Sequence, residues 1–473
     1  MKESTVKFDS NLIHIVEAIN AAPAGIAFLV DEKDKFHSVF TDGDLRRMLL
    51  KEKRLSTFLP SKYLNSKSVF AREGENMMEL MKMTSKKVRI IPILNLNNEV
   101  VDYFEYNHKT HFTPIAEPDL TGKEMEYLMD AFSSTWISSR GKYIDTFEAD
   151  FASFCDSKHG VATSNGTVAI HLALVALGIG KGDEVIVPDL TFAATINAVL
   201  HANAKPVIVD VRKEDWTIDP IEIKKAITKN TKAIIPVHIN GQPCEMDEIM
   251  SIAKDNNLKV IEDCAEAHGA EFKGQKVGSF GDINTFSFFA NKIITTGEGG
   301  MCLTNSKELY SKMRILRDHG MSPNKKYWHE VVGFNYRMTN LQAAIGCAQL
   351  ERIEDIIKQN QATEEKYHEV LGESSGINWQ SVFNHKSKVV WLVCGTVEKD
   401  RDLLIQKFRE HGIDSRPFFY SLSETAVYSK YSFSCKVSQE ISKKGINLPV
   451  KLDSDTIDSV LNQIHDVLRT TVK

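Results

Sequence analysis

Three short segments of the chain place polar side chains beside predicted strand or helix ends. Ser164-Asn-Gly-Thr167 opens an apolar helical run, where free backbone N–H groups and a hydroxyl can bind an anion, although the same pattern fits an ordinary helix cap. Asp263 ends a strand-like run, and its carboxylate can hold a cationic ligand or form a structural salt bridge. Lys292 lies among apolar and uncharged residues, so it is either a snorkelling surface lysine or an amine whose pKa is lowered by desolvation.

The anion-binding turn, the carboxylate and the amine combine with the aromatic ring of Phe192, near another strand end. This set matches the needs of pyridoxal 5'-phosphate (PLP): a helix N-terminus for the phosphate, a carboxylate to keep the ring nitrogen protonated, a flat partner for the ring and a lysine for the Schiff base. His108 and His111 have metal-like spacing but no further evident ligands, and the seven cysteines form no C-x-x-C pair. No metal site is therefore predicted.

These side chains require a scaffold of strands and helices, and the two alternate from about residue 119 onward. Helical segments at 195–202, 221–227 and 246–255 separate short runs rich in Val and Ile. The expected strands are 184–188, 206–210, 233–237, 258–262 and 284–288. The alternation predicts a mostly parallel sheet with helices on both faces, whose ligands bind at the carboxyl ends of the strands. A long helix over roughly 340–360 and beyond, and then a smaller α+β segment, are expected to follow.

Composition favours a water-soluble chain of several domains. Its 473 residues are 42% hydrophobic and 26% charged, with a net charge of −5. This charge does not favour binding to nucleic acid or to an anionic membrane surface. The N-terminal residues lack the apolar core of a signal peptide, and the most apolar stretch, 167–178, is too short for a membrane span. We therefore expect a cytoplasmic protein without nucleic-acid or membrane partners.

Seven sequence motifs occur in a characteristic order. They are Trp136–Ile144, Ser164–Thr167, Gly182–Pro188, Glu262–Gly269, Ser287–Lys292, Gly297–Gly300 and Gly333–Met338. In this order they resemble the DegT/DnrJ/EryC1/StrS family of PLP-dependent sugar-nucleotide aminotransferases over residues 113–473. The resemblance implies the α/β fold-type I architecture, with a mostly parallel seven-stranded sheet in a large domain (113–355) and a small α+β domain (356–473). It also implies a homodimer or higher homo-oligomer with active sites between subunits.

The resemblance also implies roles for individual residues. Lys292 would carry the Schiff base and move protons, and Asp263 would pair with the ring nitrogen of the cofactor. The other implied cofactor contacts are Gly166, Thr167 and Ser287 at the phosphate, Phe192 on the ring, Glu266 near the phenolic oxygen and Asn335 reaching across from the other subunit. His238 and Arg337 would contact the sugar nucleotide. Asn240 and Ser421 stand where relatives often carry Tyr and Pro, which leaves the identity of the sugar open.

The implied reaction transfers an amino group from an amino acid, L-glutamate in our prediction, to the keto group of a nucleotide-linked 4-keto-6-deoxy sugar for surface-glycan synthesis. The stretch Glu262–Gly269 is similar to that of enzymes of GDP-linked perosamine-type sugars, and UDP- and dTDP-linked sugars are left open. One alternative is a PLP-dependent sugar dehydratase, in which histidine replaces the lysine. Another is a sensor or scaffold that has lost catalysis. The intact Asp263, Ser287 and Lys292 favour the aminotransferase.

Residues 1–112 follow a different pattern, helix–strand–turn–strand–helix, which recurs after roughly 60 residues. This segment resembles a pair of cystathionine-β-synthase (CBS) modules, which are α+β ligand-sensing units. Thr41 and Asp44 match the positions at which such modules grip a ribose, which implies a nucleotide ligand there, and the second copy lacks both residues. Two alternatives stay open: Thr41 caps the helix that begins near Asp44, or the segment only dimerises the chain.

Overall fold

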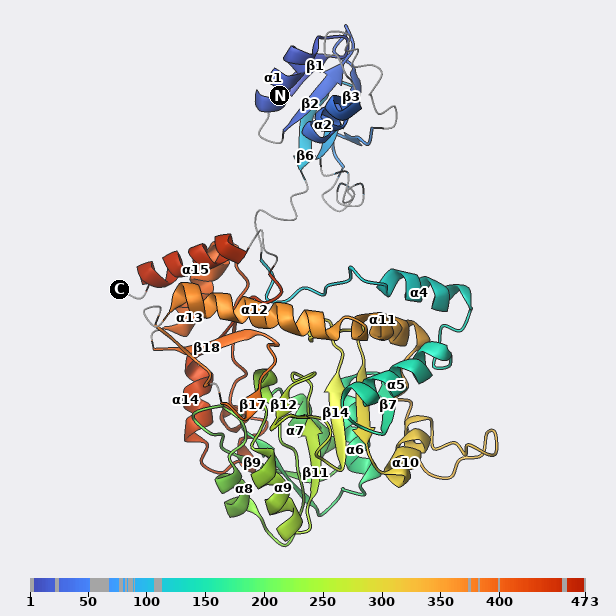
Figure 1. The fold of residues 1–473 in the computed structure, drawn as a ribbon, viewed down its shortest axis with the longest axis vertical. Helices are drawn as coiled ribbons and strands as arrows, with labels where there is room; N and C mark the ends of the chain where they lie inside the picture. The colour runs from blue at the N-terminus through green and yellow to red at the C-terminus, as the bar shows by residue number, and fades with distance from the viewer. Residues whose placement is uncertain are drawn as a thin grey trace. The chain divides into compact units, whose positions relative to one another are not determined.

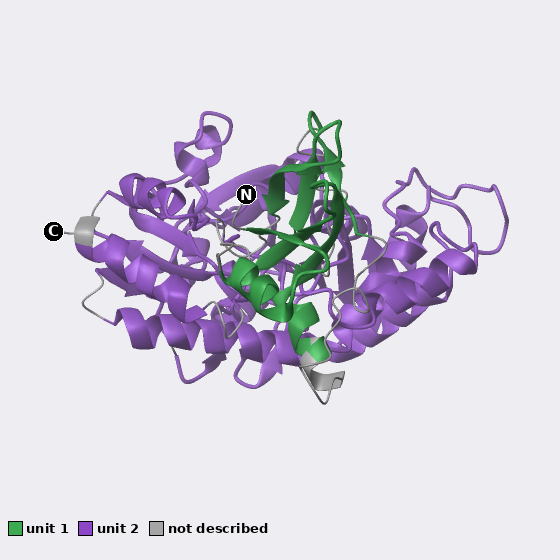
Figure 2. Cartoon of the chain, turned by 90° about the horizontal axis from the view of Figure 1, so that it is seen from above, with its two compact units in different colours: residues 1–111 green, residues 112–473 purple. Residues whose placement is uncertain are grey.

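The computed structural model divides into two compact units, residues 1–111 (unit 1) and 112–473 (unit 2), which Figure 2 shows in separate colours. The structure describes residues 4–21, 25–51, 68–75, 80, 83, 88, 90–105, 113–372, 376–381, 383–398, 400–452 and 457–471. His108 and His111, which have the metal-like spacing, lie outside these described residues.

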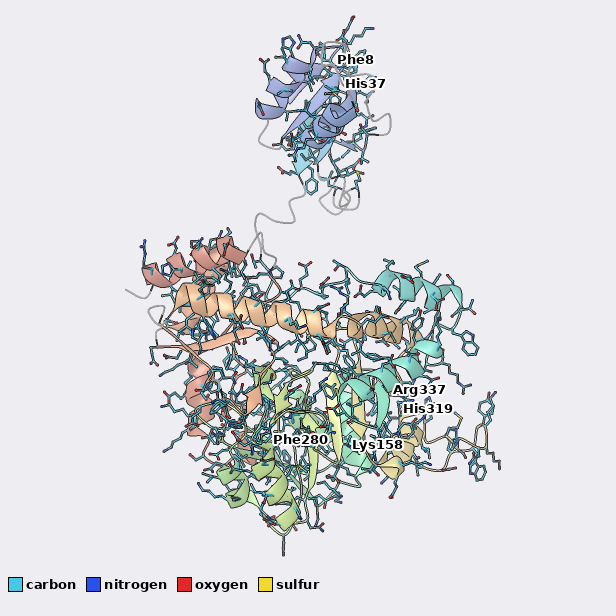
Figure 3. The ribbon with its side chains drawn as sticks, in the orientation of Figure 1. Phe8, His37, Lys158, Phe280, His319 and Arg337 are labelled. Atoms are coloured by element: carbon cyan, nitrogen blue, oxygen red, sulfur yellow. The ribbon has the colours of Figure 1, made fainter. Side chains whose placement is uncertain are left out.

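Unit 1 contains the same three-stranded motif twice. In each copy the first strand pairs in parallel with the second, and the second pairs antiparallel with the third. The elements are β1 (Thr5–Lys7), α1 (Leu12–Ala21), β2 (Ile26–Val30), β3 (Phe36–Thr41), α2 (Asp42–Lys51), β4 (Ala71–Arg72), β5 (Ile90–Leu94) and β6 (Val100–Glu105). In the first copy, Phe8 and His37 stack with ring centroids 4.9 Å apart (Figure 3).

The two copies also share the turn between their second and third strands. Oδ1 of Asp31 accepts hydrogen bonds from the backbone N–H groups of Lys33 (2.8 Å) and Lys35 (2.9 Å). Oδ1 of Asn95 accepts the equivalent bonds, from the residues two and four positions later, at 2.9 and 3.0 Å. Asp and Asn favour such turns because their side chains bond their own backbone. The strand–turn–strand part of the predicted internal repeat is confirmed, whereas the helix predicted over 77–83 lies mainly outside the described residues.

Unit 2 is built around a seven-stranded sheet with helices on both faces (Figure 1). The strand order is β7-β15-β14-β11-β10-β8-β9, and only the pairs made by β15 are antiparallel. The strands are β7 (His159–Thr163), β8 (Glu184–Pro188), β9 (Lys205–Val209), β10 (Thr231–Ile234), β11 (Lys259–Asp263), β14 (Ile283–Ser287) and β15 (Gly300–Thr304). The predicted mostly parallel sheet is confirmed. The prediction lacked β7 and β15, whose Gly- and Thr-containing sequences carry little β-branched apolar character.

Alternate side chains of the strands enter different cores. On β8, Val185 and Val187 pack in the cluster that contains residues of α6 (Gly166–Ala176) and α7 (Ala194–His201). Ile186 packs with residues of α8 (Pro220–Ala226) and α9 (Met246–Asp255). The two-residue period of a strand produces this division, and it requires apolar residues on both faces of the sheet. The helices are α4 (Glu124–Ser133), α5 (Lys142–Phe154), α6 (Gly166–Ala176), α7 (Ala194–His201), α8 (Pro220–Ala226), α9 (Met246–Asp255) and α10 (Lys307–Arg317).

The chain leaves the sheet through two consecutive helices, where the sequence analysis expects one long helix. α11 (Asn340–Leu350) ends before Arg352, whose φ of −117° is not helical, and α12 (Ile353–Leu371) begins directly after it. The guanidinium of Arg352 binds Asp119 (Nη2 to Oδ2, 2.5 Å), a contact between distant parts of the sequence that local periodicity cannot predict. α12 also runs through residue 355, the expected domain boundary.

In its described residues, the C-terminal part of unit 2 holds a four-stranded antiparallel sheet, ordered β16-β18-β20-β19, and three α-helices. The elements are β16 (Ile377–Trp379), β18 (Val393–Val397), α13 (Arg401–Glu410), β19 (Arg416–Pro417), α14 (Lys436–Lys444), β20 (Gly445–Leu448) and α15 (Ile457–Thr471). The predicted C-terminal α+β segment is therefore present. Among the described residues, no helix combines the length and the apolar character needed to cross a membrane.

Candidate active site

A cavity of about 1050 Å³ opens at the carboxyl ends of the parallel strands of unit 2. Asp263 is the last residue of β11, and Ser287 is the last residue of β14. The cavity is lined by these predicted site residues: Gly166, Thr167, Phe192, Asp263, Glu266, Ser287 and Lys292. Residues predicted from separate segments meet here because the carboxyl ends of parallel strands share one edge of the sheet.

The predicted anion site lies at the start of α6. Asn165 caps this helix, since its Oδ1 accepts a hydrogen bond from the N–H of Val168 (3.0 Å). A Cβ atom added to Gly166 would lie 2.8 Å from the Cβ of Ser287, so glycine allows the helix to approach the end of β14 this closely. Thr167 and Ser287 bring two hydroxyls to the cavity. A helix N-terminus beside hydroxyl groups is suited to a phosphate.

Asp263 is buried and held by two hydrogen bonds. The hydroxyl of Thr195 donates to Oδ2 (2.7 Å), and the N–H of Ala265 donates to Oδ1 (3.1 Å). Burial raises the pKa of Asp263, and the two hydrogen bonds and the nearby Lys292 act in the opposite direction. A carboxylate in this position can pair with a protonated ring nitrogen. That pairing would compensate for the water that the carboxylate loses on burial. Thr195 was not among the predicted site residues.

Lys292 and Glu266 lie side by side in the cavity, with Nζ 3.8 Å from Oε1. Burial lowers the pKa of Lys292, and the carboxylates of Glu266 and Asp263 oppose this effect. Burial also raises the pKa of Glu266 to about 7, and its Oε2 accepts a hydrogen bond from the N–H of Asn240 (2.8 Å). A lysine with a lowered pKa is a better nucleophile at neutral pH than an exposed lysine.

The C-terminal part of unit 2 contributes residues to the cavity that were not among the predicted site residues. The Nζ of Lys292 lies 4.2 Å from the ring centroid of Trp391. Nε1 of Trp391 donates a hydrogen bond to the backbone carbonyl of Asn291 (2.9 Å). Arg416 and Asn447 line the same cavity from the C-terminal sheet. No local pattern marks Trp391 and Asn447, whereas Arg416 begins the segment that leads to Ser421, a position already noted as differing from relatives.

The profile of the DegT/DnrJ/EryC1/StrS aminotransferase family matches residues 118–465. The chain belongs to this family. GDP-perosamine synthase of Escherichia coli O157:H7 is 45% identical over 340 residues, which are 72% of this chain and 93% of the relative. GDP-perosamine synthase of Caulobacter vibrioides is 44% identical over 362 residues, which are 75% of this chain and 98% of the relative.

Solved structures of aminotransferases share the fold of this DegT-family chain. The aminotransferase of Psychrobacter cryohalolentis has a TM-score of 0.71 and 32% identity, covering 76% of this chain and 100% of the other. Spr1654 of Streptococcus pneumoniae, assigned as a sugar aminotransferase and solved in its PLP form, has a TM-score of 0.72 and 27% identity, covering 77% of this chain and 100% of the other. The fold-type I architecture and the use of PLP are thus confirmed, and the chain is a PLP-dependent aminotransferase.

Its cavity fits that cofactor. The close approach of Gly166 to Ser287 leaves a cradle that a Cβ atom would fill, at a helix start suited to the phosphate. Asp263 is a buried carboxylate that can balance the charge of a pyridinium nitrogen, and Lys292 supplies an amine. Phe192 lines the cavity and is 59% exposed, so part of its surface is available to a flat ligand, while its ring also packs near that of Phe419 (centroids 5.6 Å apart).

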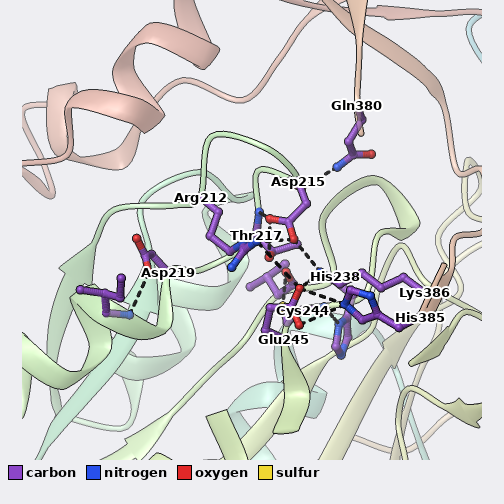
Figure 4. A network of polar contacts seen from close by, with 12 residues as sticks. Arg212, Asp215, Thr217, Asp219, His238, Cys244, Glu245, Gln380, His385 and Lys386 are labelled. Carbon is purple, nitrogen blue, oxygen red and sulfur yellow. Dashed lines mark hydrogen bonds and ion pairs between the residues drawn. The ribbon is translucent and has the colours of Figure 1, made fainter. Parts of the chain in front are cut away.

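His238 does not line the cavity of this DegT-family enzyme. It is fully buried, its Nε2 lies 3.0 Å from Oε2 of Glu262, and its Nδ1 accepts a hydrogen bond from the N–H of Cys244 (3.0 Å). Figure 4 shows it beside a buried ionic network in which Lys386 binds Asp215 (2.6 Å). Both ring nitrogens are thus engaged inside the protein, so the structure does not support the predicted contact with the sugar nucleotide.

A metal at this buried position is also disfavoured. Ligand atoms of His238, Glu262 and Cys264 lie within 4.8 Å of one another. However, the carboxylate of Glu262 already accepts hydrogen bonds from the backbone N–H groups of Gly278 and Phe280. Burial raises the pKa of the Cys264 thiol well above its usual value, whereas a metal ligand must be a thiolate. The geometry therefore favours a hydrogen-bonded core.

Arg337 and Asn335 do not line the cavity of the single chain. Arg337 pairs with Asp318 (2.8 Å), lies beside His319 (Nη2 to Nε2, 3.1 Å; Figure 3) and donates from Nε to Oδ1 of Asn335 (2.9 Å). The intervening Tyr336 does line the cavity. Contacts of Asn335 with a neighbouring subunit's cofactor, and of Arg337 with a sugar nucleotide, stay predictions.

Unit 1 lies outside the family match, which begins at residue 118. There Thr41 and Asp44 form a reciprocal helix cap. The N–H and the hydroxyl of Thr41 donate to Oδ2 of Asp44 (3.0 and 2.8 Å), and the N–H of Asp44 donates to the Thr41 hydroxyl (3.2 Å). The capping role considered in the sequence analysis is therefore present. The CBS assignment and a nucleotide ligand at these residues stay predictions.

Proposed function

We propose that the enzyme transfers the amino group of L-glutamate to the keto group of a nucleotide-linked 4-keto-6-deoxy sugar. The main observation behind this proposal is that one cavity is lined by Lys292, Asp263 and the predicted phosphate-binding residues (Gly166, Thr167 and Ser287). The sugar follows from the relatives: the two named GDP-perosamine synthases are 44–45% identical over more than 90% of their own length. A GDP-linked sugar is therefore the first candidate, for use in surface-glycan precursors.

The residues of the site divide the chemistry between them. PLP, when bound, supplies an electron sink for the electrons left behind when a proton leaves the donor's α-carbon. Asp263, oriented by Thr195 and Ala265, holds the proton on the ring nitrogen that this sink requires. Lys292 then moves the proton, because burial lowers the pKa of its amine and so raises the share of the neutral form that can accept a proton.

The cavity has room for a substrate beside the cofactor. A volume of about 1050 Å³ lies at the upper end of the range for small-molecule sites. Arg416 lines this space with a side chain that is 57% exposed, anchored by Asp414 (Nη2 to Oδ2, 3.0 Å). We propose that its guanidinium binds the carboxylate of the amino donor or the diphosphate of the nucleotide sugar, since it forms bidentate bonds with such anions.

We also propose that the enzyme works as a homodimer. α4 exposes Met125 (68%), Met129 (50%) and Phe132 (61%), whose spacing places them on one helix face. Trp136 and Ile137 follow and are 58% and 46% exposed. An apolar patch of this kind is typical of an interface. A second copy would cover it and bring Asn335 to a neighbouring site.

For unit 1 we propose a CBS-type regulatory role in which Thr41 and Asp44 bind a nucleotide or nucleotide sugar. The repeated motif and the position of both residues at a strand-to-helix turn support this proposal. Regulation also requires that the ligand favour one arrangement of the catalytic dimer over another.

Two measurements test the proposed reaction. The purified protein should show an absorbance band at about 400–430 nm that borohydride removes. It should then convert members of a panel of GDP-, UDP- and dTDP-linked 4-keto-6-deoxy sugars in the presence of glutamate, with replacement of the keto oxygen by an amino group in the mass spectrum. Loss of a hydroxyl without gain of nitrogen would indicate the dehydratase. A protein that stays colourless after addition of PLP would be a sensor or scaffold.

A further inference from the structure

The backbone that carries Lys292 is bonded to the C-terminal part of unit 2 at successive carbonyl groups. Nε1 of Trp391 donates to the carbonyl of Asn291 (2.9 Å). The side-chain nitrogen of Lys451 donates to the carbonyls of Lys292 (3.1 Å) and Ile293 (3.2 Å). Two side chains that are distant in the sequence therefore hold the segment 291–293.

Lys451 occupies an unfavourable place for a lysine. Burial lowers the pKa of its side chain to about 8, and the charge of Asp119 only partly opposes this effect. Its backbone has a φ of 61°, a left-handed conformation in which glycine is favoured and a side chain adds strain. A glycine at this position would avoid both the burial of a charged group and the backbone strain. The hydrogen bonds that the ammonium makes are therefore expected to contribute to function or to folding.

The hydrogen bonds act on the two peptide groups that flank Lys292. The carbonyl of Asn291 belongs to the peptide plane before Lys292, and the carbonyl of Lys292 belongs to the plane after it. Because each peptide group is planar, holding both carbonyls determines the φ and ψ angles of Lys292. These angles set the direction in which its side chain leaves the backbone, toward Glu266 and the ring of Trp391.

We propose that Lys451 is a positioning residue that orients the catalytic Lys292 through its backbone, in concert with Trp391. This inference rests on the proposed function, in which Lys292 is the lysine that binds PLP. Without Lys451 the peptide plane after Lys292 is free to rotate, so its amine spends less time where it can react with the cofactor. Such misplacement costs affinity for PLP as well as rate.

The test uses the full-length protein with three substitutions at one position. Lys451→Met removes the donor and keeps most of the volume, Lys451→Gly removes the donor and relieves the backbone, and Lys451→Arg restores a cationic donor. Lys276→Met is the matched control, because the ammonium of Lys276 also donates to a backbone carbonyl, that of Phe154 (2.8 Å), elsewhere in unit 2. Circular dichroism establishes that each variant is folded.

Two readouts are taken: the dissociation constant for PLP, from absorbance titration, and amide hydrogen exchange of the cofactor-free protein. We expect Lys451→Met and Lys451→Gly each to weaken PLP binding by about tenfold, as the loss of charge-assisted hydrogen bonds implies. The amides of Lys292 and Thr296, which bond the carbonyls of Phe289 and Phe288, should exchange faster. Lys451→Arg should recover much of the affinity, and Lys276→Met should change neither readout.

The opposite results would overturn the inference. Wild-type affinity and exchange in Lys451→Met would show that the ammonium does not position Lys292. Wild-type affinity in Lys451→Gly, with a loss only in Lys451→Met, would show that the loss comes from an apolar side chain on the left-handed backbone and not from the missing donor. Equal losses in Lys276→Met would show a general loss of stability. Each of these outcomes leaves the proposed function intact, whereas a wild-type protein that binds no PLP overturns both.

Discussion

The hydroxyl of Thr195 donates a 2.7 Å hydrogen bond to Oδ2 of Asp263. Thr195 lies in the first turn of α7 and Asp263 at the end of β11, so a helix and a strand that are separate in the sequence together orient one carboxylate. The hydrogen bond stabilises the charged form of Asp263 against the effect of burial. A charged and oriented Asp263 is what a protonated cofactor ring requires.

Thr195→Val should therefore slow catalysis while leaving the fold intact. The change keeps the shape of the side chain but removes a hydrogen bond to a charged group, which is worth about 1.5–3 kcal/mol, or roughly a 10- to 100-fold loss in rate. Steady-state kcat of the PLP-loaded enzyme measures the effect. Thr195→Ser, which keeps the hydroxyl, is the control. An unchanged kcat in Thr195→Val would show that the bond has no catalytic role.

Asp263→Asn should reduce kcat by at least about 10²–10³, the usual effect of removing a preorganised electrostatic contact. A neutral amide cannot balance the pyridinium charge, so the electron sink fails when the proton leaves the donor. Folding and the oligomeric state should change little, which circular dichroism and sedimentation can check. Near-normal turnover would return Asp263 to a structural role.

Lys292→Ala should abolish turnover, because it removes the amine that binds the cofactor and moves the proton. Borohydride should fix the cofactor to the wild-type protein by reducing the Schiff base, and peptide mass spectrometry should then find it on residue 292. In the variant no residue should carry the cofactor. More than a small remnant of transamination in the variant would mean that another lysine is catalytic.

Glu266 should make the stability of the cofactor-free enzyme depend on pH. Its folded pKa is raised from 4.5 to about 7, so the folded protein keeps a proton that the unfolded chain has lost. The stabilisation is present below pH 4.5 and is lost as the pH rises through about 7. Glu266→Gln cannot titrate and still offers an acceptor to the N–H of Asn240. Its unfolding midpoint relative to the wild type should therefore be higher at about pH 8 than at about pH 5. An equal difference in unfolding midpoint between Glu266→Gln and the wild type at both pH values would contradict the raised pKa of Glu266.

Unit 1 should bind a nucleotide if its Thr41 and Asp44 act as proposed. Calorimetry of the full chain with adenine nucleotides should give binding heat that disappears in Asp44→Asn and in an enzyme truncated to begin at Thr113. With guanine nucleotides only part of the heat should disappear, because the proposed GDP-linked substrate binds in unit 2. Asp44→Asn is informative because it keeps the size of the side chain and lowers its ability to accept hydrogen bonds from ribose hydroxyls. No binding heat in the full chain, with unchanged kinetics after truncation, would leave unit 1 a structural or assembly module.

Much of the sheet and of the cofactor site could be predicted because the necessary signals are local. Val- and Ile-rich runs predicted five of the seven strands, while β7 and β15 were missed because their sequences, with Gly and Thr, carry a weak pattern. Gly166, Ser287 and Lys292 lie in short contiguous motifs at strand or helix ends. The order of parallel strands then brings such ends together without further information.

By itself the sequence determined the family, the cofactor and several residues that line the cavity within a few positions of a strand end, such as Asp263 and Lys292. Only the tertiary structure decided that Thr195 donates a hydrogen bond to Asp263, and that Trp391 and Lys451 donate to the backbone carbonyls of Asn291 and Lys292. It also decided that His238 belongs to a buried hydrogen-bonded core and does not line the cavity. The reason is physical: these contacts join segments far apart in the chain, and their partners follow from how the C-terminal sheet and the helices pack, which no local spacing records.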